Sequence, residues 1–211
     1  MDAQLIIFDL DGTLIDSRSD LAAGINHMRA QYDLDALSLE MVSSYIGDGI
    51  RKLVERSLQG ADVNVDEAVE LNKAYYLSHL TVHTTLYEGV AEGLHQLVDA
   101  GHQVALLTNK PGDPSREILK HFGLSDCFVA VVGGGDVPNL KPKPDGIFQC
   151  LEIAGVPASQ VWMVGDHHTD LAAAHHAGVR SVLVEYGFGH AGDYKPTAHF
   201  ASFPEVVEYF V

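Results

Sequence analysis

Five short apolar runs along the chain predict strands that are buried on both faces. Each run is rich in Val, Ile, Leu or Phe and lacks the strict polar alternation of a half-exposed strand. The predicted strands comprise residues 4–8, 103–107, 128–132, 161–164 and 180–184. Strands of this kind are typical of a parallel sheet that helices cover on both sides.

Stretches with the apolar spacing of helices separate most of these strands. The predicted helices comprise residues 90–100, 114–121, 147–154 and 169–177. Gly123 and Gly178 follow two of them, at the position where a helix commonly ends in a left-handed residue. Strands that alternate with helices imply right-handed crossovers. The predicted fold class is therefore α/β, with a Rossmann-like, doubly wound parallel sheet.

The stretch between the first predicted strand and the second is much longer than one crossover helix requires. Apolar residues recur there at helical spacing, as in Leu21 and Ile25, and strand-like runs are few. We therefore predict an inserted all-helical cap domain over residues 17–85, and an α/β core formed by residues 1–16 and 86–211. An insert that leaves the core at the tip of the first strand would cover that tip as a lid.

The composition narrows the classes of partner. The 211 residues carry 29 acidic side chains against 13 Lys and Arg, a formal net charge of −16, and no basic tract. Nucleic-acid binding depends on many cations that neutralise phosphates, so nucleic acid is not an expected partner. No apolar run approaches the roughly 18 residues of a membrane span, and residues 1–15 lack the early basic cluster of a signal peptide. We expect no membrane partner, a cytoplasmic location, and a monomer or a homodimer.

Polar residues follow the predicted strands at their carboxyl ends, where open α/β sheets bind ligands. They are Asp9, Asp11, Thr108, Asn109, Lys141 and Asp166. Two carboxylates two positions apart repel each other, and an apolar environment strengthens the repulsion. A hard divalent cation such as Mg²⁺, which prefers carboxylate oxygens and phosphate, would remove this conflict.

Four segments resemble, in order, the motifs of a known family. DLDGTLIDS is similar to the first motif of the haloacid dehalogenase-like phosphohydrolases, LLTN to the second, LKPKPD to the lysine-bearing third and VGDHHTD to the fourth. The resemblance covers nearly the whole chain, and the helical insert stands where this family has its smaller cap. Its details resemble phosphoglycolate phosphatases and their near relatives. The resemblance implies a Mg²⁺-dependent phosphatase of a small phosphorylated metabolite, with phosphoglycolate as the lead substrate.

The resemblance also implies roles for the acids. Asp9 would attack phosphorus to give an aspartyl phosphate, which splits one difficult displacement into two. Asp11 would protonate the leaving oxygen and later take a proton from water. Mg²⁺ would be held by Asp9, by the backbone carbonyl of Asp11 and by Asp166.

The resemblance assigns the phosphate contacts to the second and third motifs. Thr108 and the Asn109 backbone would hold phosphate oxygens, and Lys141 would steady both the nucleophile and the phosphate. The sequence KPKP offers Lys143 as an alternative lysine, but the family pattern favours the first.

Three further residues would support the site. Gly12 would let the chain approach the substrate closely, and Thr13 would tie the loop down. Asp170 would not bind the ion but would lie beside it and pair with Lys141.

Four histidines near the fourth motif allow two interpretations. His167, His168, His175 and His176 form two adjacent pairs, and neutral imidazoles can bind a transition metal. The pairs do not share one helix face, so we favour solvated surface positions. His167 also stands where relatives usually carry a small residue such as serine. If its side chain reaches the site, activity should show an extra ionisation near neutral pH that His167→Ser abolishes.

The segment YIGDGIRKLVERSL, residues 45–58, resembles the part of the phosphoglycolate phosphatase cap that faces the active site. It also has the spacing of an amphipathic helix that begins after a glycine-rich turn. Arg51 is a candidate for binding the non-reacting end of the substrate, because a guanidinium suits a carboxylate.

Several activities remain open at this point. A sugar-phosphate phosphatase, a phosphomutase, a pyrophosphatase and a nucleotidase would share Asp9 and Asp11. A phospho-acceptor module without turnover belongs to a different class, and it would need a long-lived phosphoryl group. Asp11 argues against such a module, since a proton donor and acceptor beside the nucleophile favours rapid hydrolysis.

Overall fold

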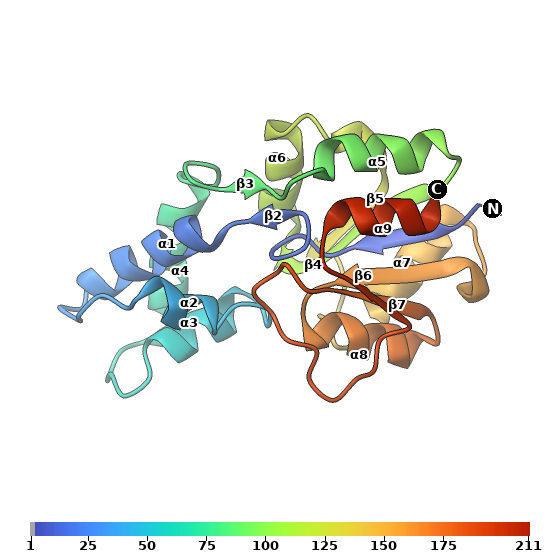
Figure 1. Cartoon of the computed structure of the whole chain (residues 1–211). Coiled ribbons are helices and arrows are strands. Elements are labelled where there is room, and N and C mark those ends of the chain that lie inside the picture. Colours follow the sequence, from blue (N-terminus) through green and yellow to red (C-terminus); the bar gives the residue numbers. More distant parts are fainter. Residues whose placement is uncertain (1–2) are drawn as a thin grey trace.

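A six-stranded parallel sheet forms the centre of the computed structural model, which describes residues 3–211 (Figure 1). The strand order is β5-β4-β1-β6-β7-β8. The strands are β1 (Leu5–Phe8), β4 (Gln103–Pro111), β5 (Phe128–Gly134), β6 (Val161–Gly165), β7 (Arg180–Val184) and β8 (Ala198–Phe200). All five predicted strands are confirmed, and β8 was not predicted. Residues 1 and 2 of the predicted core lie outside the described residues.

Alternate residues of each strand face the two layers of helices that cover the sheet. Ile6 and Phe8 join the core beneath one layer, whereas Leu5 and Ile7 join the core beneath the other. The first layer comprises α5 (Val90–Asp99), α6 (Gly112–His121) and α9 (Phe203–Phe210), and the second comprises α7 (Asp145–Ala154) and α8 (His168–Ala177). Short 3₁₀ turns, Ser125–Cys127 and Ala158–Gln160, precede β5 and β6. The doubly wound α/β prediction is therefore confirmed.

Strand β4 is longer than the apolar run that predicted it. It continues through Thr108 and Asn109 to Pro111, and α6 begins directly afterwards at Gly112, two residues before the predicted start. The register of β4 against β5 shifts between Leu107 and Pro111. The polar end of β4 is thus extended backbone held in the sheet, which gives its side chains fixed positions.

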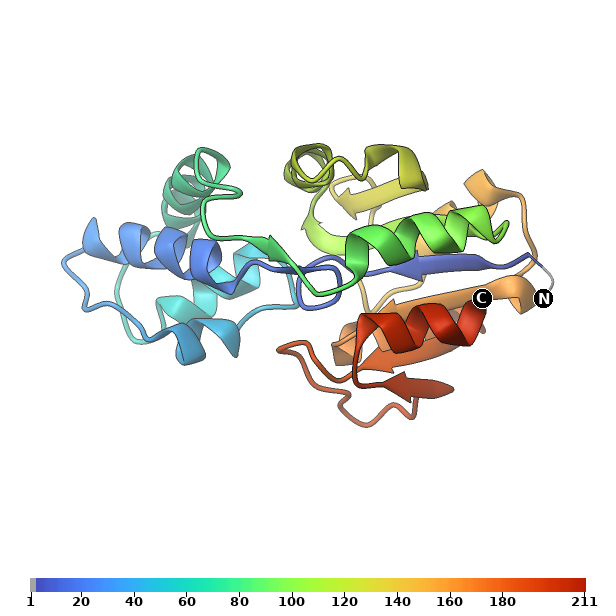
Figure 2. The same ribbon diagram turned by 45° about the horizontal axis from the view of Figure 1, so that its top comes forward.

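The remaining helices gather beside the carboxyl end of the sheet (Figure 2). They are α1 (Arg18–Ala30), α2 (Leu39–Ser43), α3 (Ile50–Ser57) and α4 (Val65–Leu77). They bury an apolar cluster of their own, which includes Ile25, Met28 and Val54. We refer to these four helices and their loops as the cap.

Two short strands join the cap to the sheet. They are β2 (Ile15–Asp16) and β3 (Thr85–Leu86), and they pair in antiparallel fashion. This ribbon lies at the two points where the predicted insert meets the predicted core. Among the described residues, no helix is both long and apolar enough to cross a membrane.

Candidate active site

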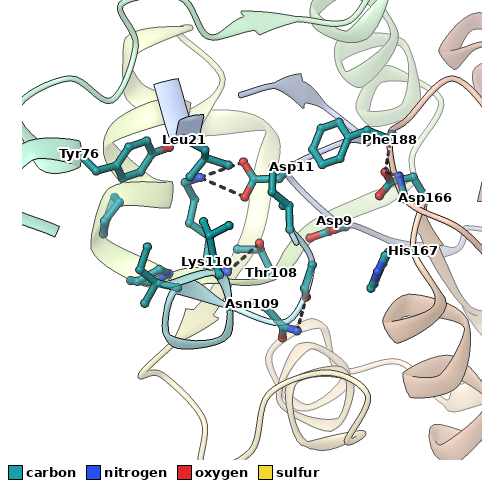
Figure 3. A pocket seen from close by; sticks show the side chains of 18 of the residues that line it. Asp9, Asp11, Leu21, Tyr76, Thr108, Asn109, Lys110, Asp166, His167 and Phe188 are labelled. Carbon is teal, nitrogen blue, oxygen red and sulfur yellow. Dashed lines mark hydrogen bonds and ion pairs between the residues drawn. The ribbon is translucent and has the colours of Figure 1, made fainter. Parts of the chain in front are cut away.

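The carboxyl ends of three adjacent strands bring most of the predicted residues together. Phe8, at the end of β1, lies opposite Leu106 of β4 and Val164 of β6. The residues that follow these positions line one pocket beneath the cap (Figure 3). From the core they are Asp9, Asp11, Thr108, Asn109, Lys110, Asp166 and His167. The predicted convergence on one rim is thus what the structure shows.

Three buried carboxylates form the acidic part of the site. One oxygen each of Asp9, Asp166 and Asp170 lies within 4.8 Å of the others. Burial raises the pKa of Asp9 to about 6, although Lys141 opposes this. Burial, followed by the charges of Asp9 and Asp170, also raises the pKa of Asp166 well above its ordinary value. Three carboxylates against the single ammonium of Lys141 leave excess negative charge, so the donor set fits a hard divalent cation.

Mg²⁺ is expected to raise the melting temperature more above pH 6 than below it. An unfolded aspartate titrates near 3.8 and folded Asp9 near 6. Between these values the folded protein binds more protons than the unfolded chain, so without a cation its stability falls as pH rises. Mg²⁺ binds the ionised carboxylates and offsets this loss. Differential scanning fluorimetry with and without Mg²⁺ measures the melting temperature. An equal rise in melting temperature above and below pH 6 would contradict the prediction.

Lys141, and not Lys143, reaches the acids. Its ammonium lies 2.8 Å from Asp9 Oδ1 and 2.7 Å from Asp170 Oδ1, and it donates to the Leu107 carbonyl at 2.8 Å. Burial alone would lower the pKa of Lys141, but Asp170 and Asp9 together raise it. Lys143 is exposed. The geometry therefore agrees with the lysine that the family pattern favoured.

Asp166 is held from one side by backbone amides and closed in on the other by glycines. Its Oδ2 accepts hydrogen bonds from Phe188 N at 3.0 Å and Gly189 N at 2.8 Å. Gly12 has a φ of +88°, and a Cβ there would lie 2.1 Å from the same Asp166 oxygen. The glycine of the first motif is thus required by the approach of Asp166.

Asn109 connects three parts of the site through its side chain. Its Nδ2 donates to the carbonyl oxygens of Gly47 in the cap and Lys141, at 2.8 and 2.9 Å. Its Oδ1 accepts from Lys141 N at 2.8 Å. The Thr108 hydroxyl accepts from Lys110 N at 3.2 Å, so its own proton remains available for a ligand oxygen.

Lys110 is the site residue that the sequence analysis missed. Its ammonium lies 2.9 Å from Asp11 Oδ1 and 4.9 Å from the centre of the Tyr76 ring. Burial alone would lower the pKa of Lys110, but Asp11 and Tyr76 together raise it. Ser17 Oγ also donates to Asp11. The sequence could have indicated Lys110, because side chains two positions apart on an extended strand share a face, and Lys110 therefore lies on the same side as Thr108.

Asp11 and Asp9 face different parts of the pocket. Figure 3 shows the Asp11 side chain directed at Lys110, while Asp9 lies near Asp166 and His167. The Asp11 carboxylate is therefore not part of the acidic cluster. Of Asp11, only the backbone carbonyl then remains for the expected contact with Mg²⁺.

Thr13 is fully buried, but its hydroxyl has no hydrogen-bond partner among the described residues. The loop is tied down through the Thr13 carbonyl instead, which accepts from Tyr186 Oη at 2.7 Å.

The structure does not bring Arg51 to the pocket. Its guanidinium pairs with Asp66 at 2.7 Å and Glu55 at 3.2 Å, and its side chain is 57% exposed. Glu55 lies one helical turn from Arg51, so Arg51 can pair with it at the helix surface without reaching beneath the helix. The same segment contributes Gly47 and Ile50 to the pocket lining instead.

His167 is buried, contrary to the surface position that we favoured, whereas His175 and His176 are exposed. Its ring lines the pocket and lies against Gly47 of the cap. Burial, and then the neighbouring His168, lower the pKa of His167 to about 4. The extra ionisation proposed near neutral pH is therefore not expected, although the side chain does reach the site.

Comparison with known proteins gives a consistent assignment. Phosphoglycolate phosphatase of Neisseria gonorrhoeae is 40% identical over 192 residues, which are 88% of this chain and 81% of the relative. That of Psychrobacter arcticus is 34% identical over 223 residues, covering 100% of this chain and 97% of the relative.

Solved structures agree with the sequence relatives. The crystal structure of a predicted phosphoglycolate phosphatase from Haemophilus somnus has a TM-score of 0.94 and 30% identity, and the match covers 100% of this chain and 99% of that one. The family model for haloacid dehalogenase-like hydrolases matches residues 6–184. The chain therefore belongs to the haloacid dehalogenase-like hydrolases.

Proposed function

We propose that the protein is a Mg²⁺-dependent phosphatase that hydrolyses a small phosphate monoester through an aspartyl phosphate. The observation that carries the proposal is the buried cluster of Asp9, Asp166 and Asp170 with Lys141, of which Asp9 and Asp166 line the pocket. Asp9 and Asp166, with the backbone of Asp11, would hold the ion. Bound there, Mg²⁺ supplies charge neutralisation for the phosphate oxygens and the carboxylates.

The side chains divide the chemistry between two steps. In the first step, an oxygen of Asp9 bonds to phosphorus as the bond from phosphorus to the leaving oxygen breaks, and Asp11 gives that oxygen a proton. In the second step, water attacks the aspartyl phosphate, Asp11 takes a proton from it, and Asp9 is released. Lys141 pairs with Asp9 Oδ1, which leaves Oδ2 as the attacking atom.

The pocket favours a small, anionic substrate, with 2-phosphoglycolate as the lead. The cavity measures about 70 Å³, and the cap lines it with apolar side chains such as Ile46, Ile50 and Leu53. Lys110 is the buried cation above Asp11, where the leaving group of the phosphate ester must lie. The relatives in Neisseria and Psychrobacter bear the name phosphoglycolate phosphatase. The cytoplasmic location remains a prediction.

A panel of phosphorylated metabolites, assayed for phosphate release with Mg²⁺, tests the proposal. It should include 2-phosphoglycolate, sugar phosphates, nucleotides and pyrophosphate, with Asp9→Asn as the background. We expect the highest kcat/KM for 2-phosphoglycolate. Transfer of phosphate between hexose phosphate positions would instead indicate a mutase, and an aspartyl phosphate that persists for minutes would indicate a phospho-acceptor module.

Lys110→Met is expected to reduce selectivity for a carboxylate-bearing substrate. A hydrogen bond to a charged group contributes about 1.5–3 kcal/mol, so kcat/KM for 2-phosphoglycolate should fall about 10- to 100-fold further than for ethyl phosphate, which lacks the carboxylate. Both esters release an aliphatic oxygen that needs a proton from Asp11, so an effect of Lys110 on Asp11 lowers the rate for both substrates.

Arg51→Ala is the matched control, because Arg51 is a cation of the cap that faces solvent. Its ratio of kcat/KM values should equal that of the parent protein. If Arg51→Ala changes the ratio and Lys110→Met does not, the substrate carboxylate binds elsewhere than we propose.

A further inference from the structure

Three histidines converge at the edge of the pocket, outside the carboxylate cluster. His167 and His168 begin α8, and His190 reaches them from the loop after β7. The centre of the His167 ring lies 4.1 Å from the centre of the His168 ring and 5.1 Å from that of the His190 ring. One nitrogen of each of the three rings lies within 4.8 Å of the others. The phosphatase chemistry described above uses none of these nitrogens.

One nitrogen of the cluster is left without a hydrogen-bond partner among the described residues. The Nδ1 atom of His168 is buried, and no described residue forms a hydrogen bond with it. A buried polar nitrogen without a partner is unfavourable by about 1–3 kcal/mol, unless something absent from the protein chain binds it. His167 Nδ1 contacts Thr169 Oγ1 at 3.0 Å and accepts from Thr169 N at 3.5 Å, which fixes the orientation of that ring.

We propose that His167, His168 and His190 form a binding site for a borderline transition-metal ion such as Zn²⁺, separate from the carboxylate site for Mg²⁺. Imidazole ligands favour zinc, nickel and copper, whereas Mg²⁺ favours oxygen, so the two sites select different ions. This inference does not depend on the proposed phosphatase activity.

Closing the site around an ion requires one histidine ring to turn. Nitrogens around a tetrahedral zinc ion lie about 3.3 Å apart, given metal–nitrogen distances of about 2.0–2.1 Å. The His168 and His190 rings are stacked at 5.0 Å, so one of them must turn to aim its nitrogen at a shared ion. His190 is exposed, and Gly189 and Gly192 flank it, which gives its side chain and loop the freedom to do so.

An ion at this site would connect the loop after β7 to the start of α8. The same loop donates two backbone hydrogen bonds to Asp166 through Phe188 and Gly189. His167 in turn lies against Gly47 of the cap. Zn²⁺ would therefore restrain both the loop that holds Asp166 and the edge of the pocket.

Isothermal titration of tag-free protein with Zn²⁺ in excess Mg²⁺ tests the site. We expect one Zn²⁺ per chain, and His190→Ala should weaken the binding by at least about tenfold. His175→Ala is the matched control, because His175 is an exposed histidine of α8 outside the cluster. Its affinity should equal that of the parent protein.

Asp9→Asn separates the two metal sites, since it alters the carboxylate cluster but none of the three histidines. We expect it to keep the Zn²⁺ affinity of the parent protein. The visible absorption of Co²⁺, used as a probe in place of Zn²⁺, should report nitrogen ligands that His190→Ala removes. Zn²⁺ binding that survives His190→Ala unchanged, or that is lost in Asp9→Asn, would overturn the proposal.

Discussion

Asp9→Asn is expected to lower kcat by about 10⁴- to 10⁶-fold, the range seen when a nucleophile is removed from an enzyme that acts through a covalent intermediate. The amide keeps the shape of the carboxylate but cannot attack phosphorus. The measurement is phosphate release under saturating substrate and Mg²⁺. Turnover within about tenfold of the parent protein would exclude Asp9 as the nucleophile.

The same variant should fold at least as well as the parent protein when no metal is present. Burial raises the pKa of Asp9 to about 6, so above that pH the folded state carries an unfavourable charge that Asn removes. Its melting temperature without Mg²⁺ should be equal or higher. A large fall would mean that lost activity reflects misfolding.

Lys141→Met is expected to reduce the free energy of unfolding by about 3–5 kcal/mol, because it leaves buried carboxylates without their cation. Lys141 lies within 2.8 Å of both Asp9 and Asp170. It should also lower kcat, since Lys141 is the one described side chain that forms an ion pair with Asp9. Urea unfolding followed by circular dichroism measures the stability.

Lys143→Met is the matched control, as it alters an exposed lysine two residues away and should change stability by no more than about 0.5 kcal/mol. If Lys141→Met does not fold, the double variant Lys141→Met with Asp170→Asn should recover folded protein. It removes one of the two buried carboxylates, Asp9 and Asp170, that lose their ion-pair partner. Equal effects of the two single lysine variants would contradict the assignment of Lys141.

The sheet and the rim of the site could be predicted from the sequence because each depends on local patterns. Strands buried on both faces are apolar throughout, and parallel strands all end at the same edge of the sheet. The positions of Asp9, Thr108 and Asp166 at the ends of such strands predict that they lie together. Strand β8 was not predicted because it is an edge strand of three residues, none of them fully buried, and it therefore contains no apolar run.

The residues that were missed or misplaced depend on contacts across the chain. Lys110 is buried because Asp11, far away in the sequence, and Tyr76 of the cap surround it. Arg51 faces solvent because Asp66 of the next helix pairs with it. His167 is buried by the cap loop at Gly47. Periodicity within one helix cannot register partners of this kind.

The Asn109 carboxamide gives the cap its one described side-chain hydrogen bond to the end of β4, through the Gly47 carbonyl. A single neutral hydrogen bond contributes about 0.5–1.5 kcal/mol net, which corresponds to a severalfold change in an equilibrium. We therefore expect the loop around Gly47 to detach readily from the strand. Opening of that loop would then let reactant enter and phosphate leave while the paired strands β2 and β3 keep the rest of the cap joined to the core.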